Sequence, residues 1–137
     1  MRLFKVTGLV SMMALGLSAC GNEVLTKQEV NSLPLQQFAI TACTSVLAEN
    51  FEQLEIMMEK KYFTELKNLH DKEERAWSNL SNKVTCTIES QKTIKAFGFQ
   101  SEMFKFNTSA NGALNISIAE TDGQRVVDGF HLSGFSS

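Results

Sequence analysis

The stretch VTCTIE, residues 84–89, decides the fold because the spacing of apolar side chains changes there. Val84, Cys86 and Ile88 alternate with polar residues, and this period of about 2 is typical of a strand with one buried face. Before residue 81 the apolar residues instead follow the helical period of about 3.6. Helices first and strands after predict an α+β domain, in which N-terminal helices pack on an antiparallel meander sheet of about four to five strands.

The clearest helical pattern is LQQFAITACTSVL, residues 35–47. Its apolar side chains fall at the spacing of one buried helical face. They are Leu35, Phe38, Ala39, Ala42, Cys43, Val46 and Leu47. Ser32, near the cap, and Pro34, in the first turn, are expected to open this helix, because the missing N–H of proline costs nothing there. Cys43 therefore points toward whatever the helix packs on.

The residues between this helix and the first strand predict more helical structure. The apolar residues of the range 51–58 either extend the first helix or form a second one after a break near Asn50. The pair Met57-Met58 is interpreted as core. Residues 59–80 have the spacing of another amphipathic helix, and we interpret their charged run at 71–75 as a solvated face.

Further candidate strands follow residue 89. They are Ile94–Phe99, Phe104–Phe106, Leu114–Ala119 and Arg125–Leu132. Gly98 and Gly129 suggest a bulge or bend in the first and last of them. Asn111-Gly112 and Asp122-Gly123 are typical of tight hairpin turns, which join antiparallel strands.

The first 19 residues have the pattern of an export signal. Arg2 and Lys5 precede the uncharged run Val6–Leu17. A helix of this length rises about 18 Å, well short of the roughly 30 Å hydrocarbon core of a bilayer. We therefore predict a signal peptide over residues 1–19 rather than a permanent span.

The end of this run, Leu17-Ser18-Ala19-Cys20, resembles the lipobox of bacterial lipoproteins at each position. The resemblance implies that the Cys20 thiol carries diacylglycerol, that the chain is cut before Cys20, and that the new amino terminus is acylated. Two or three acyl chains would anchor the protein to the membrane. In that family an aspartate at the position of Asn22 retains the protein in the inner membrane. Asn22 thus implies the inner leaflet of the outer membrane, facing the periplasm, if the cell has two membranes. The alternative is a buried cysteine beside an ordinary cleavage site.

Residues 20–32 are predicted to be the lipidated cysteine and a short tether, because Gly21–Asn31 is polar and shows no folding signal. Fully extended, this segment reaches about 36 Å. The single domain, residues 33–135, would therefore lie close to the bilayer.

Three cysteines are an odd number for an exported chain, and lipidation of Cys20 would remove the oddity. In an oxidising compartment we expect Cys43 and Cys86 to form a disulfide, for which the chain-entropy model gives about 4 kcal/mol; two separate buried thiols are the alternative. His70 and His131 have no partners at a metal-ligand spacing, so we expect neither metal nor cofactor.

The charge argues against nucleic-acid binding. The full chain has a formal charge of −2, and removal of Arg2 and Lys5 with the signal peptide makes it −4. No basic stripe is present in the sequence. With 43% hydrophobic residues and ten phenylalanines, the chain has the material for one core.

The element order and the final hairpin, residues 119–130, resemble the cystatin-like and nuclear-transport-factor-two-like lipoproteins. The resemblance covers residues 33–135, but Arg125-Val126 stand where that family has a bulky aromatic residue. Members range from enzymes to ligand-binding cones to partner-binding modules, so the resemblance implies a fold and no single activity.

Three activities remain as hypotheses. Catalysis is not expected, because its only candidates are Asp128 with His131, three residues apart on a strand, and His70 in a charged helix.

A carrier of a small apolar ligand would need a cone-shaped pocket under the sheet. The aromatic residues that could line such a pocket, or simply fill the core, are Phe97, Phe99, Phe104, Phe106 and Phe130.

We favour the third hypothesis, a non-enzymatic module held at the membrane by Cys20 that binds a partner, such as another envelope protein. It predicts an exposed apolar patch or an unpaired sheet edge.

Overall fold

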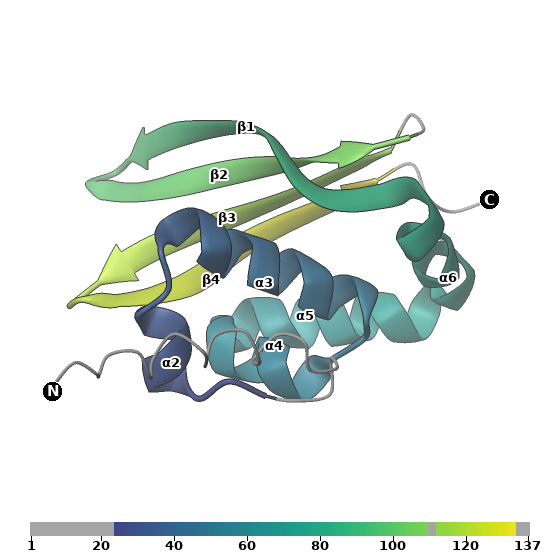
Figure 1. The fold of residues 1–137 in the computed structure, drawn as a ribbon, viewed down its shortest axis with the longest axis horizontal. Helices are drawn as coiled ribbons and strands as arrows, with labels where there is room; N and C mark the ends of the chain where they lie inside the picture. The colour runs from purple at the N-terminus through teal and green to yellow at the C-terminus, as the bar shows by residue number, and fades with distance from the viewer. Residues whose placement is uncertain (1–23, 110–111, 134–137) are drawn as a thin grey trace, which may run out of the picture.

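The computed structural model describes residues 24–109 and 112–133, and within them the chain forms an α+β domain (Figure 1). Helices come first in the chain, and a meander sheet follows. The helices are α2 (Lys27–Asn31), α3 (Leu35–Leu47), α4 (Phe51–Met57), α5 (Lys60–Lys72) and α6 (Glu74–Lys83). The strands are β1 (Val84–Ala96), β2 (Phe99–Thr108), β3 (Ala113–Thr121) and β4 (Gln124–Ser133). The predicted fold class is therefore confirmed.

The strands form one antiparallel sheet in the order β1-β2-β3-β4. Phe104 of β2 lies opposite Ile116 of β3, and Ile116 lies opposite Phe130 of β4. These residues share the face that the helices cover, which we call the inner face (Figure 1). The opposite face, which no described helix covers, is the outer face.

The core lies between the inner face and α3, the helix nearest the sheet (Figure 1). Most of the apolar residues that the helical pattern predicts on one face of α3 are buried, among them Phe38, Ala42 and Val46, whereas Leu35 and Leu47 at the helix ends are partly buried. Ser45, which the pattern did not predict, is buried as well. Trp77 of α6 also packs into this core, and its indole Nε1 donates a hydrogen bond of 3.2 Å to the carbonyl oxygen of Val46. This bond satisfies the indole N–H, which burial would otherwise leave without an acceptor.

The helices between α3 and the sheet are more divided than the pattern indicates. A second helix, α4, does follow a break, and the Asn50 side chain caps it by accepting a hydrogen bond from Gln53 N at 3.2 Å. The single helix expected over residues 59–80 is wrong, because Glu73 has a non-helical backbone (φ −118°, ψ 53°) that separates α5 from α6. Both helices keep the same apolar spacing, so the sequence period gave no sign of the break.

The described part of the segment expected to be a tether, residues 24–32, contains a helix and belongs to the packed domain. Thr26 and Glu29 cap α2 reciprocally: Glu29 N donates to Thr26 Oγ1 at 3.1 Å, and Thr26 N donates to Glu29 Oε1 at 2.8 Å. Val30 is buried to 1% exposure in the core. The expected domain start at residue 33 is therefore too late, and the capping-box pattern T-x-x-E was the signal that could have located α2.

The sheet has four strands, and the additional strand expected at Ile94–Phe99 is wrong. Its first residues are the end of β1, and Phe97 (φ 50°) and Gly98 (φ 81°) form the two-residue turn into β2. Asp122 (φ 53°) and Gly123 (φ 77°) form the expected turn between β3 and β4. The expected irregularity at Gly129 is also present, as a change of register opposite Ser117 and Ile118. The other expected turn, Asn111-Gly112, begins outside the described residues.

Candidate functional site

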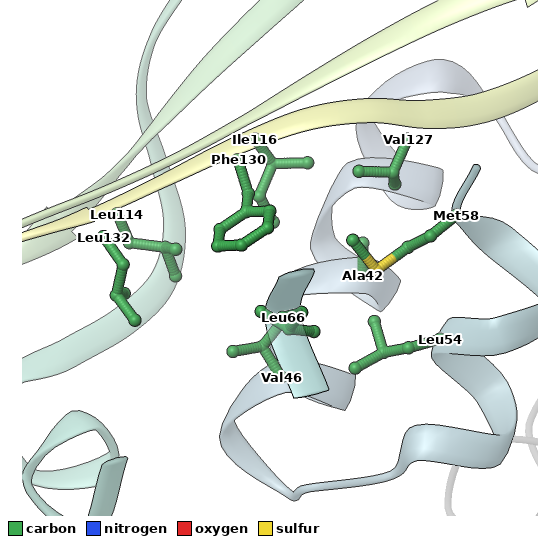
Figure 2. A pocket seen from close by; sticks show the side chains of 10 residues that line it. All are labelled: Ala42, Val46, Leu54, Met58, Leu66, Leu114, Ile116, Val127, Phe130 and Leu132. Atoms are coloured by element: carbon green, nitrogen blue, oxygen red, sulfur yellow. The ribbon is translucent and has the colours of Figure 1, made fainter. Parts of the chain in front are cut away.

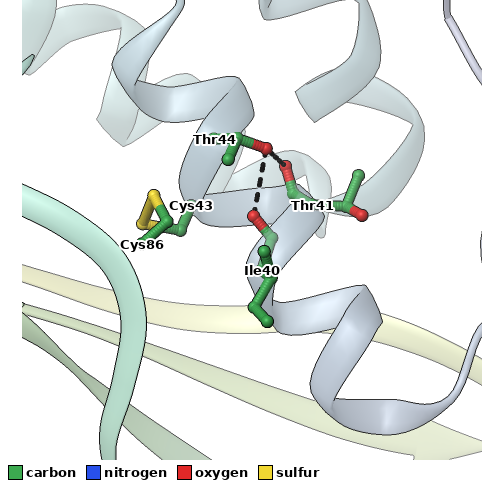
Figure 3. Close-up of a disulfide and its surroundings, with 5 residues drawn as sticks. All are labelled: Ile40, Thr41, Cys43, Thr44 and Cys86. Carbon is green, nitrogen blue, oxygen red and sulfur yellow. Dashed lines mark hydrogen bonds between the residues drawn. A yellow bond between two sulfur atoms is a disulfide. The ribbon is translucent and has the colours of Figure 1, made fainter. Parts of the chain in front are cut away.

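The disulfide between Cys43 and Cys86 is present and joins α3 to β1, with the two Cα atoms 5.7 Å apart (Figure 3). Cys43 faces the sheet because it lies on the apolar side of α3, and Cys86 faces the helices because it alternates with exposed Thr85 and Thr87. The alternative of two separate thiols is therefore excluded. Cys20 and the whole lipobox lie outside the described residues.

The aromatic residues that could line a pocket divide into two groups. Phe104 and Phe106 are completely buried in the core, and Phe130 lines a cavity of about 10 Å³ among apolar side chains of α3, α4, α5, β3 and β4 (Figure 2). That cavity is about the size of one water molecule, whereas ligand pockets enclose roughly 300–1,000 Å³. These three rings are therefore core side chains.

Phe97 and Phe99 do not line a pocket, which corrects their expected placement. They are 98% and 76% exposed at the turn between β1 and β2. Phe99 lies five residues from the buried Phe104 on β2, so its side chain belongs to the outer face, which no described helix covers. Phe97 lies in the turn itself, beyond the point where the Gln36 side chain at the start of α3 meets Gln91 (Gln36 Nε2 to Gln91 Oε1, 3.2 Å), and no described element packs on it.

A groove of about 390 Å³ lies beneath this end of the sheet, next to the start of α3. Its lining is mixed, with Leu35 and Ile118 beside the carboxylates of Glu102 and Glu120. None of the five predicted aromatic residues lines it. The groove is open to solvent and partly acidic, and it is unlike the apolar cone that a carrier would need.

The register shows which residues occupy the outer face. Phe99 lies opposite Ala96, and Met103 opposite Lys92, on the face away from the buried Phe104. On the same face, Ile94 lies opposite Ser101, and Ser101 lies opposite Ala119. Toward the β1–β2 turn this face is therefore mainly apolar. We call this surface the apolar end, and it consists of Ile94, Ala96, Phe97, Phe99 and Met103.

The centre of the outer face is polar and half-buried. Ser101 Oγ of β2 donates a hydrogen bond of 2.7 Å to Asp128 Oδ2 of β4. The contact passes over β3, where the side chains of Ser117 and Ala119 are small enough to leave room. Asp128 is the extra residue of the β4 irregularity, which turns its carboxylate toward this face. Its other oxygen, Oδ1, has no hydrogen-bond partner among the described residues.

The outer face does not assemble a nucleophile with a base. A serine nucleophile needs an imidazole or comparable base between it and the carboxylate, but Ser101 bonds directly to Asp128. His131 is exposed near the other end of the face, opposite Asn115, and makes no described hydrogen bond to Asp128. The pairing on which the catalytic hypothesis depended is therefore absent from the described residues.

The second histidine lies in an aromatic cluster that the sequence pattern did not reveal. His70 is held between Phe51 and Trp77, with ring centroids 4.9 and 5.0 Å away, and its Nε2 lies 3.0 Å from Glu49 Oε1. Glu49 has the left-handed φ of 57°, at the junction of α3 and α4. These contacts hold the junction of α3 and α4 against α5 and α6, and we interpret the aromatic cluster as structural.

Two further properties of the described residues bear on the site. Among the described residues, no group of three or more His, Cys, Asp or Glu side chains is arranged to hold a metal ion. None of the described helices is long and apolar enough to span a bilayer.

The chain was also compared with models of protein families, with curated proteins and with solved structures, and none of them matches it. The resemblances to the lipobox and to the cystatin-like and nuclear-transport-factor-two-like lipoproteins therefore stay predictions.

Proposed function

We propose that this chain is a lipid-anchored protein of the bacterial cell envelope that acts by binding rather than by catalysis, through the apolar end of its outer face. The observation that carries the proposal is the exposure of Phe97 and Phe99. Single exposed apolar residues are ordinary, but two aromatic rings beside Ile94 and Met103 form a contiguous patch of the kind that marks interaction sites.

The cysteines support the location in the envelope. The Cys43–Cys86 disulfide is the kind of bond that persists in exported proteins and is rare in a reducing cytosol. With those two thiols consumed, Cys20 is the cysteine left for lipidation, at the last position of a lipobox-like sequence. Acylation there would hold the domain at a membrane surface.

The carrier hypothesis has weaker support. The cavity beside Phe130 holds about 10 Å³ of free space, and the rings expected to line a pocket are either packed in the core or exposed at the hairpin. A ligand would have to displace core side chains, which are packed at high density in proteins. Binding at an exposed surface requires no such rearrangement.

The lipid anchor can be tested by mass spectrometry of the mature protein. We expect the amino-terminal peptide to begin at Cys20 and to carry acyl mass, and we expect the C20S variant to carry none. A native protein that begins at another residue, or that has no added mass, contradicts the anchor.

The binding surface can be tested in intact cells with a photo-crosslinking amino acid in place of Phe99. The matched control carries the same group in place of His131, which is also exposed on the outer face but lies near its other end. We expect adducts from position 99 and few from position 131. Equal or absent adducts at the two positions would refute a binding role for the apolar end.

A further inference from the structure

The two charged residues nearest the β1–β2 turn along the hairpin are both lysines. Between Gln91 and Ser101 the charged residues are Lys92 and Lys95, and no acidic residue occurs in that range. Neither lysine forms an ion pair with a described carboxylate. The nearest acidic residue along β2, Glu102, accepts hydrogen bonds from the Thr93 hydroxyl at 2.7 Å and the Gln91 amide at 3.2 Å.

The two lysines flank the aromatic turn on both faces of the hairpin. Lys92 lies opposite Met103 on the outer face, whereas Lys95 lies opposite Gln100 on the inner face. Both are exposed, and both precede Phe97 by only a few residues. The tip of the hairpin is thus apolar, and the charged residues nearest to it are one lysine on each face, with Glu102 farther from the turn, opposite Thr93.

The first described helix, α2, lies at the same end of the sheet as the β1–β2 and β3–β4 turns (Figure 1). Arg125 at the start of β4 holds it there, since its backbone N donates to Asn31 Oδ1 at 2.6 Å and its guanidinium donates to the Leu33 carbonyl oxygen. Cys20 precedes the first residue of α2, Lys27, by seven residues, which span at most about 25 Å.

From these three observations we infer that the β1–β2 hairpin is a second membrane contact, in which Phe97 and Phe99 enter the interface of an anionic bilayer and Lys92 and Lys95 contact its headgroup phosphates. The inference rests on the proposed lipid anchor, because Cys20, seven residues before α2 in the sequence, would keep the domain close to the bilayer. Apolar side chains flanked by basic residues bind anionic interfaces in this way. The aliphatic part of each lysine side chain can extend along the apolar region while its ammonium group stays in the polar layer.

The shape of the hairpin favours a lipid surface over a protein partner. A protein that bound Phe97 specifically would need a pocket complementary to a narrow, projecting turn. A fluid bilayer needs no such complementarity, and it accepts any exposed ring at its interface. The anchor would also make insertion intramolecular, so a weak contact would suffice.

The test uses the full, acylated protein in vesicles of phosphatidylethanolamine and phosphatidylglycerol with brominated acyl chains, which quench tryptophan on contact. The F97W variant carries the probe at the turn, and H131W carries it near the other end of the outer face. Trp77 is buried and gives the same background in both. We expect several-fold stronger quenching, and a blue shift, for F97W.

A second variant checks the charge. The K92E/K95E changes, made in F97W, should reduce the quenching, and replacing phosphatidylglycerol with neutral phosphatidylcholine should have the same effect. Retained quenching under both changes would overturn the role of the lysines.

Equal quenching of F97W and H131W, or no quenching of either, overturns the hairpin contact, and so does in-cell photo-crosslinking of position 99 to protein alone. If these results come from a protein with acyl mass on Cys20, only this inference fails. If the mass is missing, the proposed anchor fails as well.

Discussion

The two halves of β1 belong to one strand but have opposite surroundings. In the first half Val84, Cys86 and Ile88 contact the helices, and Cys86 is bonded to α3. In the second half almost every residue from Glu89 to Ala96 is exposed. The difference follows from geometry: α3 and β1 both contain 13 residues, but a helix of that length rises about 20 Å and a strand about 43 Å. One helix therefore covers only part of such a strand.

The largest expected effect is at the covered end. Replacing Phe104 by alanine removes a completely buried ring opposite Ile116 and should lower the free energy of unfolding by about 3–5 kcal/mol. Urea denaturation followed by circular dichroism measures it. A loss below about 1 kcal/mol would show that this part of the sheet is not packed as described.

The next effect concerns the disulfide that fixes β1 to α3. The C43A/C86A variant should be less stable by about 2–4 kcal/mol, because its unfolded chain regains the freedom that the cross-link removes. The midpoint temperature of thermal unfolding should fall on addition of a reductant for the native protein, whereas for the double variant it should not change. A reductant effect in both proteins would point to a cause other than this bond.

A smaller effect is expected at the polar centre of the outer face. S101A removes the donor to Asp128 Oδ2 and should cost about 1 kcal/mol in the same urea assay. S90A, an exposed serine of β1, is the matched control and should change stability by less than about 0.5 kcal/mol. Equal effects of the two variants would argue against the Ser101–Asp128 bond.

The smallest effect on stability is expected at the uncovered end. F99S should change the free energy of unfolding by no more than about 0.5 kcal/mol, because the ring is already 76% exposed. Compared with F104A, it tests whether Phe99 and Phe104, which lie on opposite faces of β2, differ in burial because the helices cover only the inner face. A loss of several kcal/mol from F99S would mean that the ring is buried.

The candidate site was less predictable from the sequence than the fold. Alternation correctly assigned Phe104 and Phe106 to a buried face, but Phe97 and Phe99 could not be assigned to a turn and to the outer face before the bounds of β1 and β2 were known. The Ser101–Asp128 contact was also beyond prediction, because it joins two strands across a third and depends on an irregularity in β4. Exposure and long-range pairing depend on how whole elements are placed.

Local patterns were sufficient for the order of helices and strands, the buried face of α3 and the Asp122-Gly123 turn, because each depends on side-chain periods or turn chemistry within a short stretch of chain. The pairing of Cys43 with Cys86 was predicted from the number of cysteines in the sequence. Packing determined the break at Glu73, the inclusion of α2 in the domain and the exposure of the β1–β2 turn. These features depend on the lengths of elements laid against one another, a property that no window of neighbouring residues contains.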